Sequence, residues 1–160
     1  MLYVMCGCPG SGKTTYAANL LMKIPHTVYV SRDACRLLFL QEKEDYFSRE
    51  KEVFASFLAQ ICDNLQAGFN VIADATHLNV KSRNKLINGI AQKIKDFEVT
   101  YICLETPLAT CLKRNGKRNG AARVPEEVLK DMYNRYHRPT LEEHKQIKQI
   151  VVIKEENQNE

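Results

Sequence analysis

Apolar residues along the chain fall into two patterns, short continuous runs and longer stretches with helical spacing. Continuous apolar runs bounded by polar residues are typical of strands that are covered on both faces of a parallel sheet. They predict strands at residues 2–6, 27–30, 69–74, 97–104 and 147–153. Between these runs apolar residues recur every three or four positions, which is the spacing of a helix face. This spacing predicts helices from 14 to 24, from 31, from 48 to 66, from 80 to 95, from 106 and from 125.

Strands that alternate with helices in this way predict an α/β fold, with a parallel five-stranded sheet and helices on both of its faces. The 160 residues fit one domain, which we expect at 1–153, followed by a polar tail at 154–160.

The composition describes an ordinary soluble protein, with 44% apolar and 26% charged residues. The six cysteines form no C-x-x-C pair, so we expect reduced thiols and a cytoplasmic protein. The apolar start is too short for a signal peptide or a membrane span, and no membrane association is expected. A net charge of +4 says little about partners by itself.

One motif changes this picture. Residues 7–14 spell G-x-x-x-x-G-K-T between the first predicted strand and the first predicted helix, which is the setting of a phosphate-binding P-loop. Its backbone N–H groups and the helix dipole favour phosphate. Lys13 would reach the β- and γ-phosphates and the Thr14 hydroxyl would ligate Mg²⁺. The alternative is a glycine-rich turn with a solvated lysine. The chain has no N-K-x-D guanine reader, which favours ATP over GTP.

Polar residues follow the strand at 27–30 directly. Asp33 should lie at the carboxyl edge of the sheet beside the P-loop, where its carboxylate can accept a proton from an attacking hydroxyl. It can equally be an acidic residue that stabilises the start of a helix. Arg36 lies three residues further on the same helix face, either to grip a phosphate of the acceptor or as a paired surface arginine.

Asp74 ends the third predicted strand, as does the aspartate that P-loop proteins place near Mg²⁺. Its other interpretation is that it holds Arg36 in place. Thr76 brings a hydroxyl to the same edge, and His77 is interpreted as a loop histidine rather than a base.

The segment 113–123 carries five positive charges and no acidic residue, with glycines at 116 and 120 that allow it to bend. We interpret residues 112–124 as a lid that closes over the triphosphate, with one arginine stabilising transition-state charge. A non-specific nucleic-acid patch and a solvated loop are the alternatives.

Five groups of residues together resemble one family. They are Gly7-Cys8-Pro9-Gly10-Ser11-Gly12-Lys13-Thr14-Thr15, Arg32-Asp33 with Arg36, Asp74-Ala75-Thr76, Lys113-Arg114-Asn115-Gly116-Lys117-Arg118, and Val124-Pro125 with Val128-Leu129 and Met132-Tyr133. In this order they resemble the kinase domain of the bacteriophage-type polynucleotide kinase, from residue 1 to about 140, which is also compatible with a phage origin. The second, phosphatase domain of that family has no counterpart here, and the segment after Asp74 is one residue longer.

The resemblance implies a P-loop kinase fold with a basic helical lid, and transfer of the ATP γ-phosphate to the 5′-hydroxyl of DNA or RNA, with Mg²⁺ as cofactor. Residues 7–15 would bind the nucleotide, with Lys13 and Thr14 at the phosphates and the metal.

By the same resemblance, Asp33 would activate the 5′-hydroxyl and Arg36 would hold the acceptor's phosphate, positioned by Asp74. Arg118 would clasp the donor phosphates, and Arg114 would lie against the adenine. Two further hypotheses stay open: a P-loop kinase of a small molecule or nucleotide sugar, and an ATP-binding module without phosphoryl transfer.

Overall fold

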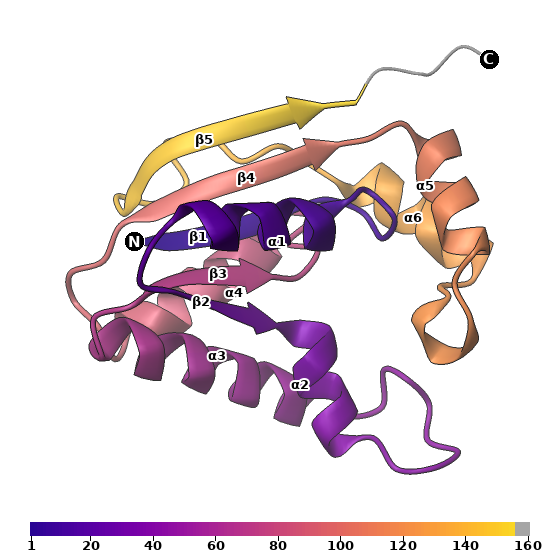
Figure 1. Ribbon diagram of the computed structural model, residues 1–160, viewed down its shortest axis with the longest axis horizontal. Coiled ribbons are helices and arrows are strands. Elements are labelled where there is room, and N and C mark those ends of the chain that lie inside the picture. The colour runs from indigo at the N-terminus through magenta and orange to yellow at the C-terminus, as the bar shows by residue number, and fades with distance from the viewer. Residues whose placement is uncertain (156–160) are drawn as a thin grey trace.

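A computed structural model of the chain describes residues 1–155 and contains one parallel five-stranded sheet. The strands are β1 (Leu2–Cys6), β2 (Thr27–Ser31), β3 (Asn70–Asp74), β4 (Val99–Glu105) and β5 (Ile147–Lys154). Their order is β2-β3-β1-β4-β5, so β1 lies in the centre (Figure 1). All four pairings are parallel, which confirms the predicted α/β fold and its five strands.

The helices also follow the predicted order. They are α1 (Lys13–Lys23), α2 (Arg32–Phe39), α3 (Glu50–Gln66), α4 (Val80–Ala91), α5 (Leu108–Gly116) and α6 (Glu126–Arg135), with a 3₁₀ turn, η1 (Gly120–Ala122), between the last two. The helix predicted to reach residue 95 ends at Ala91. Ile94 lies beyond the end of this helix, and its N–H donates a hydrogen bond to the Ile90 carbonyl. Its side chain still packs on the core, which explains why the apolar spacing continues to this residue.

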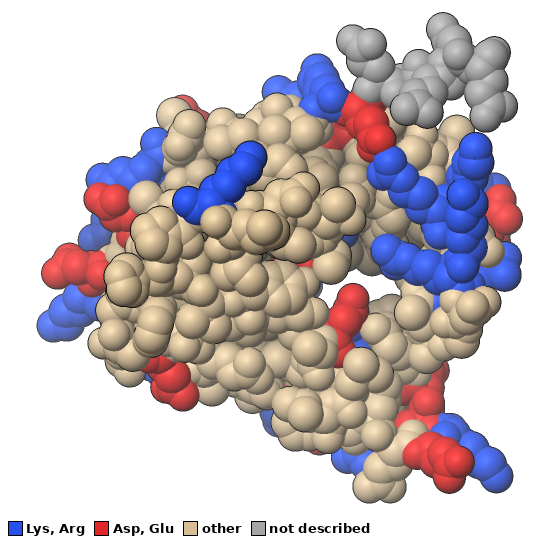
Figure 2. Space-filling model, viewed as in Figure 1, with Lys and Arg blue, Asp and Glu red and all other residues tan. Residues whose placement is uncertain are grey.

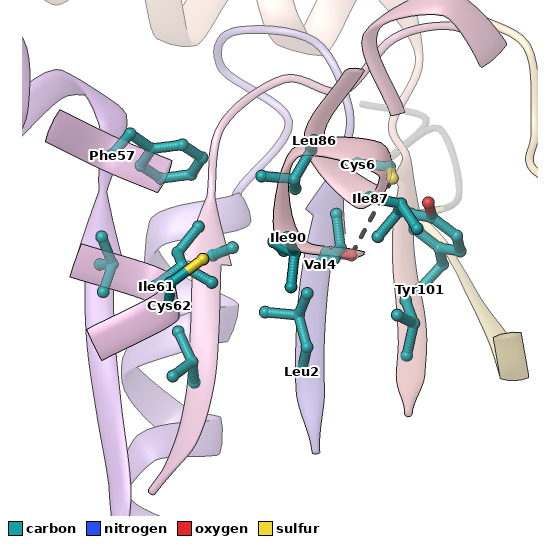
Figure 3. Close-up of a cluster of buried hydrophobic side chains, with 14 of the residues drawn as sticks. Leu2, Val4, Cys6, Phe57, Ile61, Cys62, Leu86, Ile87, Ile90 and Tyr101 are labelled. Atoms are coloured by element: carbon teal, nitrogen blue, oxygen red, sulfur yellow. Dashed lines mark hydrogen bonds between the residues drawn. The ribbon is translucent and has the colours of Figure 1, made fainter. Parts of the chain in front are cut away.

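Two apolar layers hold the sheet between helices. Because neighbouring side chains of a strand point to opposite faces, alternate residues of β1 belong to different layers. One face packs on α3 and α4 in the largest core cluster, part of which Figure 3 shows: Leu2, Val4, Cys6, Phe57, Ile61, Cys62, Leu86, Ile87, Ile90 and Tyr101. The other face packs on Ala17 of α1 through Met5, Ile72, Ile102 and Leu104. Helices therefore cover both faces, as predicted.

The strands all end toward the side of the molecule where α2, α5 and α6 lie (Figure 1). A third apolar cluster there joins the P-loop to α5 and α6 through Cys8, Leu78, Cys111, Val124 and Leu129. This cluster sets the base of the lid segment 112–124 against the phosphate loop.

Lys154, predicted as the first residue of a polar tail at 154–160, belongs to β5 instead. Lys154 is the last residue of β5 and pairs with Glu105 of β4. Glu155 forms an ion pair with Arg114, with 2.5 Å between Oε1 and Nη2. Residues 156–160 lie outside the described part of the chain.

Candidate active site

The phosphate loop is tightly wound between β1 and α1. Gly10 and Gly12 have φ angles of 81° and 96°, a region that favours glycine. A Cβ at Gly10 would lie 2.6 Å from the Cys111 carbonyl oxygen, so a side chain does not fit there. The Ser11 Oγ is buried without a hydrogen-bond partner. An unpartnered buried hydroxyl in a phosphate-loop motif fits a phosphate, whose oxygens can accept its hydrogen bond.

Lys13 is folded back onto this loop. Only 9% of its surface is exposed, and Nζ donates a hydrogen bond to the Cys8 carbonyl at 2.8 Å. Burial lowers the pKa of its ammonium group, which the Asp74 carboxylate opposes. A partly desolvated cation gains more from an arriving phosphate than a solvated one does.

Thr14 and Asp74 meet at the start of α1 and the end of β3. The Thr14 hydroxyl donates to Asp74 Oδ2 at 3.0 Å, and the Tyr29 hydroxyl donates to the same oxygen at 2.5 Å. Burial and the hydrogen bond to Asp74 raise the pKa of Tyr29 to about 12. A hydroxyl and a carboxylate beside a phosphate cradle are hard oxygen ligands, so this pair fits Mg²⁺.

The P-loop borders a cavity of about 460 Å³, lined also by Thr15, Tyr16, Leu104, Arg114 and Glu155. Arg114 spans its edge, since Nη1 donates to the Gly10 carbonyl at 3.3 Å and Nη2 pairs with Glu155. We refer to this space as the donor cavity. Its size and its position over the phosphate loop suit a nucleotide.

A second cavity, of about 270 Å³, lies next to it and contains the other predicted residues: Lys13, Thr14, Asp33, Arg36, Asp74, Thr76 and Arg118. We refer to it as the acceptor cavity. Lys13, Thr14 and Arg118 line both cavities, so the two spaces adjoin at these side chains. The sequence had predicted this meeting of separate segments at one edge of the sheet.

Each segment is held in place locally. Asp33 lies in the first turn of α2, where the Ser31 hydroxyl caps the helix by accepting from the Ala34 N–H. The Gly7 N–H donates to the Thr76 carbonyl at 2.9 Å, which ties the phosphate loop to the loop after β3.

Arg36 pairs here with Glu50 and Asp33, whereas support by Asp74 was one of the two roles that the sequence left open for that aspartate. Arg36 is 5% exposed, and its Nε and Nη2 donate to both carboxylate oxygens of Glu50 at 2.7 and 3.1 Å. Its Nη1 pairs with Asp33 Oδ1 at 2.5 Å. Glu50 opens α3, which packs on α2. The helix contact brings Glu50 to Arg36, whereas Asp74 is engaged by Thr14 and Tyr29.

Three residues of the acceptor cavity were missed by the sequence analysis: Tyr46, Phe47 and Glu50. Tyr46 and Phe47 belong to the charged stretch after α2 that shows no periodic pattern, and Glu50 is the first residue of α3. The available signal was an adjacent pair of aromatic residues in an otherwise polar stretch, close in sequence to Arg36.

His77 is a loop residue, as predicted, but it is buried. Only 4% of its surface is exposed, its φ is 43°, and Nδ1 lies 2.7 Å from the Met5 carbonyl oxygen. Burial lowers its pKa to about 4. A neutral ring fixed to β1 fits a structural role.

Two hydrogen bonds between Asn115 and Val124 join the two ends of the lid segment 112–124. The Asn115 side chain donates to the Val124 carbonyl at 2.6 Å and accepts from the Val124 N–H at 2.9 Å. Figure 2 shows Lys and Arg side chains gathered here, over α5 and the turn after it, beside a hollow in the surface. Arg118 is the lid residue that reaches both cavities.

Within residues 1–155, none of the helices has the length and apolar character needed to cross a bilayer.

Comparisons with known proteins agree with this geometry. Residues 2–139 match a family model described as an AAA domain, AAA_33. An L-seryl-tRNA(Sec) kinase of Methanococcus maripaludis is 32% identical over 87% of this chain and 53% of its own length. A "Putative bifunctional polynucleotide kinase/RNA ligase" of Autographa californica nuclear polyhedrosis virus is 26% identical over 84% of this chain and 20% of its own length. The chain thus spans about half of one relative and a fifth of the other.

Among solved structures, Chaetomium thermophilum Kti12 in complex with ADP-AlF3 superimposes with a TM-score of 0.73. The match covers 96% of this chain and 89% of Kti12, at 17% sequence identity, so it speaks for the fold alone. With most of its length matched by the family model, the chain belongs to this AAA domain family and has the P-loop kinase fold.

Proposed function

We propose that the protein is an ATP-dependent kinase that transfers the γ-phosphate of ATP to the 5′-hydroxyl of DNA or RNA. The observation that carries the proposal is the meeting of the two cavities at Lys13, Thr14 and Arg118, with Asp33 and Arg36 on the acceptor side. Phosphoryl transfer needs positioning and charge neutralisation more than covalent help, and this arrangement offers both.

On the donor side, residues 7–15 would hold the triphosphate, with Arg114 beside the adenine. Thr14 and Asp74 would hold Mg²⁺, which neutralises phosphate charge when it is bound. Lys13 would release the Cys8 carbonyl and turn to the phosphate oxygens. The P-loop motif and the match to the AAA domain family support this site as one for ATP.

On the acceptor side, the Asp33 carboxylate would accept the proton of the attacking hydroxyl. Arg36, held by Glu50, would bind a phosphate of the acceptor, with the Thr76 hydroxyl nearby. Arg118 would stabilise the charge on the phosphoryl group in transit. These are the roles that a kinase active on a phosphate-bearing chain requires.

Nucleic acid as the acceptor is supported by the positive charge of the lid segment and by the relative whose name includes a polynucleotide kinase. The buried, unpaired cysteines support a cytoplasmic location.

A second candidate is a kinase for a hydroxyl carried by an aminoacyl-tRNA or a small molecule. The relative with the higher identity, named as an L-seryl-tRNA(Sec) kinase, favours it. Both candidates use the same donor cavity and the same Asp33, and they differ in what Arg36 and the lid contact. The third candidate is a module that binds ATP without transferring phosphate. In that case Asp33 would have no catalytic role.

The test is incubation of the protein with γ-labelled ATP, Mg²⁺ and a 5′-hydroxyl oligonucleotide, as DNA and as RNA. The same oligonucleotide with a 5′-phosphate is the matched control, and seryl-tRNA is the competing acceptor. We expect label on the 5′-hydroxyl oligonucleotide alone. Label on seryl-tRNA but not on the oligonucleotides would favour the second candidate. No label on any of these acceptors would leave a small-molecule kinase and the third candidate.

A further inference from the structure

The carboxylate at the end of β3 is held from two directions. Asp74 is 6% exposed, and its Oδ2 accepts hydrogen bonds from the Thr14 hydroxyl at 3.0 Å and from the Tyr29 hydroxyl at 2.5 Å. Within residues 1–155 no hydrogen bond reaches Oδ1, and Asp74 lines the acceptor cavity. Two donors therefore fix one oxygen of this carboxylate and leave the other to whatever binds in the cavity.

Tyr29 reaches Asp74 because of the register between β2 and β3. Tyr29 lies opposite Ile72, and Ser31 lies opposite Asp74. Tyr29 therefore starts two residues short of the carboxylate, which is about 6.6 Å along a strand. A serine or threonine at this position would be too short to span that distance. The Tyr29 ring packs against the apolar cluster that includes Ile72, under α1, and this packing holds the phenol in place.

The phenol of Tyr29 is a permanent donor rather than an acid or a base. Burial and the hydrogen bond to Asp74 raise its pKa to about 12, so the hydroxyl stays protonated at neutral pH. A neutral hydroxyl orients a carboxylate without neutralising it, whereas a lysine or arginine in its place would compete with a cation for the same charge. Tyr29 thus keeps the charge of the Asp74 carboxylate available.

We propose that Tyr29 is a positioning residue for Mg²⁺, which holds Asp74 in the orientation that leaves Oδ1 to contact the ion or a water bound to it. Tyr29 acts through Asp74 and does not touch the ion itself. The inference rests on the Mg²⁺ site of the proposed function, and it needs no assumption about the acceptor. Groups that hydrogen-bond to a metal-ligating carboxylate orient it, and their loss lowers metal affinity or activity by roughly 10- to 100-fold.

A purely structural role for Tyr29 predicts a different result. If the hydroxyl only joined β2 to β3, its loss would loosen this edge of the sheet and weaken nucleotide binding with and without the ion alike. The part of the nucleotide affinity that depends on Mg²⁺ therefore distinguishes the two roles. ADP is the suitable nucleotide for this measurement because it has no γ-phosphate to transfer.

The variant Tyr29→Phe keeps the ring and its packing and removes only the hydroxyl. Calorimetry then measures the affinity for ADP in excess EDTA and in excess Mg²⁺. We expect the affinity without Mg²⁺ to stay within about twofold of wild type, and the gain on adding Mg²⁺ to fall by a factor on the order of ten. The matched control is Tyr3→Phe, which packs in the same apolar layer, lines neither cavity and should keep the full gain.

The double variant Asp74→Asn/Tyr29→Phe should match Asp74→Asn alone, because Tyr29 acts through Asp74. Three results would overturn the inference: a wild-type gain in Tyr29→Phe, an equal loss of ADP affinity with and without Mg²⁺, or a further loss of the gain in the double variant. None of these measurements contains an acceptor. If labelling of oligonucleotides fails while Tyr29→Phe loses the gain from Mg²⁺, the proposed acceptor is wrong and the role of Tyr29 stands.

Discussion

The donor and acceptor cavities adjoin, but they are built in different ways. The donor cavity is made largely by one continuous stretch, residues 10–16, in which Gly10 and Gly12 take positive φ angles. The acceptor cavity is made by side chains from α2, the segment after it, α3, β3 and the lid. Backbone geometry fixes what is bound, here phosphate, whereas a side-chain network can be altered one residue at a time. The difference teaches that the phosphate donor is set by the fold, and the acceptor by a few exchangeable contacts.

The largest expected effect on turnover is that of a substitution at Asp33, which lines the acceptor cavity but not the donor cavity. In Asp33→Asn we expect turnover to fall by about 10³- to 10⁴-fold, because the amide does not accept the proton of the acceptor hydroxyl. ATP affinity, measured by calorimetry, should stay within about twofold since Asp33 lines only the acceptor cavity.

Asp63→Asn, on the exposed side of α3, is the matched control and should behave as wild type. Retained turnover in Asp33→Asn would reduce Asp33 to a residue that stabilises the start of α2.

The next effect concerns Arg118, the lid residue common to both cavities. Arg118→Ala should lower kcat by a factor on the order of 10³ if its guanidinium stabilises charge in the transition state. Arg123→Ala removes an exposed arginine of the same lid segment and should leave kcat within about twofold.

Rates measured at several salt concentrations distinguish the alternatives for this segment. Similar losses in both arginine variants, confined to the KM and steeply salt-dependent, would make the lid a nucleic-acid patch without a catalytic arginine.

The sequence predicted the donor cavity more completely than the acceptor cavity. The P-loop is contiguous, so its motif alone located Lys13 and Thr14, and apolar runs located all five strands. The strand order β2-β3-β1-β4-β5 depends on tertiary pairing that no local pattern encodes. On the acceptor side, Asp33 and Arg36 were found because they follow a strand directly. Glu50 was missed because only the packing of α3 on α2 brings it to Arg36.

The smallest expected effect tests this last assignment. Burial opposes ionisation of Glu50, but its hydrogen bonds with Arg36 and Arg32 outweigh burial and lower its pKa, so it is a carboxylate at neutral pH. Glu50→Gln removes that charge and should raise the KM for the acceptor about tenfold, with kcat and the KM for ATP little changed. Glu52→Gln, two residues further along α3, is the matched control.

Asp74→Asn completes the comparison, because the sequence left two roles open for Asp74, near Mg²⁺ or as the support of Arg36. With Asp74 bonded to Thr14, its amide variant should raise the Mg²⁺ concentration needed for half-maximal rate and leave the acceptor KM unchanged. The reverse pattern, an acceptor KM that rises in Asp74→Asn and not in Glu50→Gln, would mean that Arg36 changes partners when substrates bind. The acceptor cavity would then be remade in each cycle, and the donor cavity alone would be the fixed part of the site.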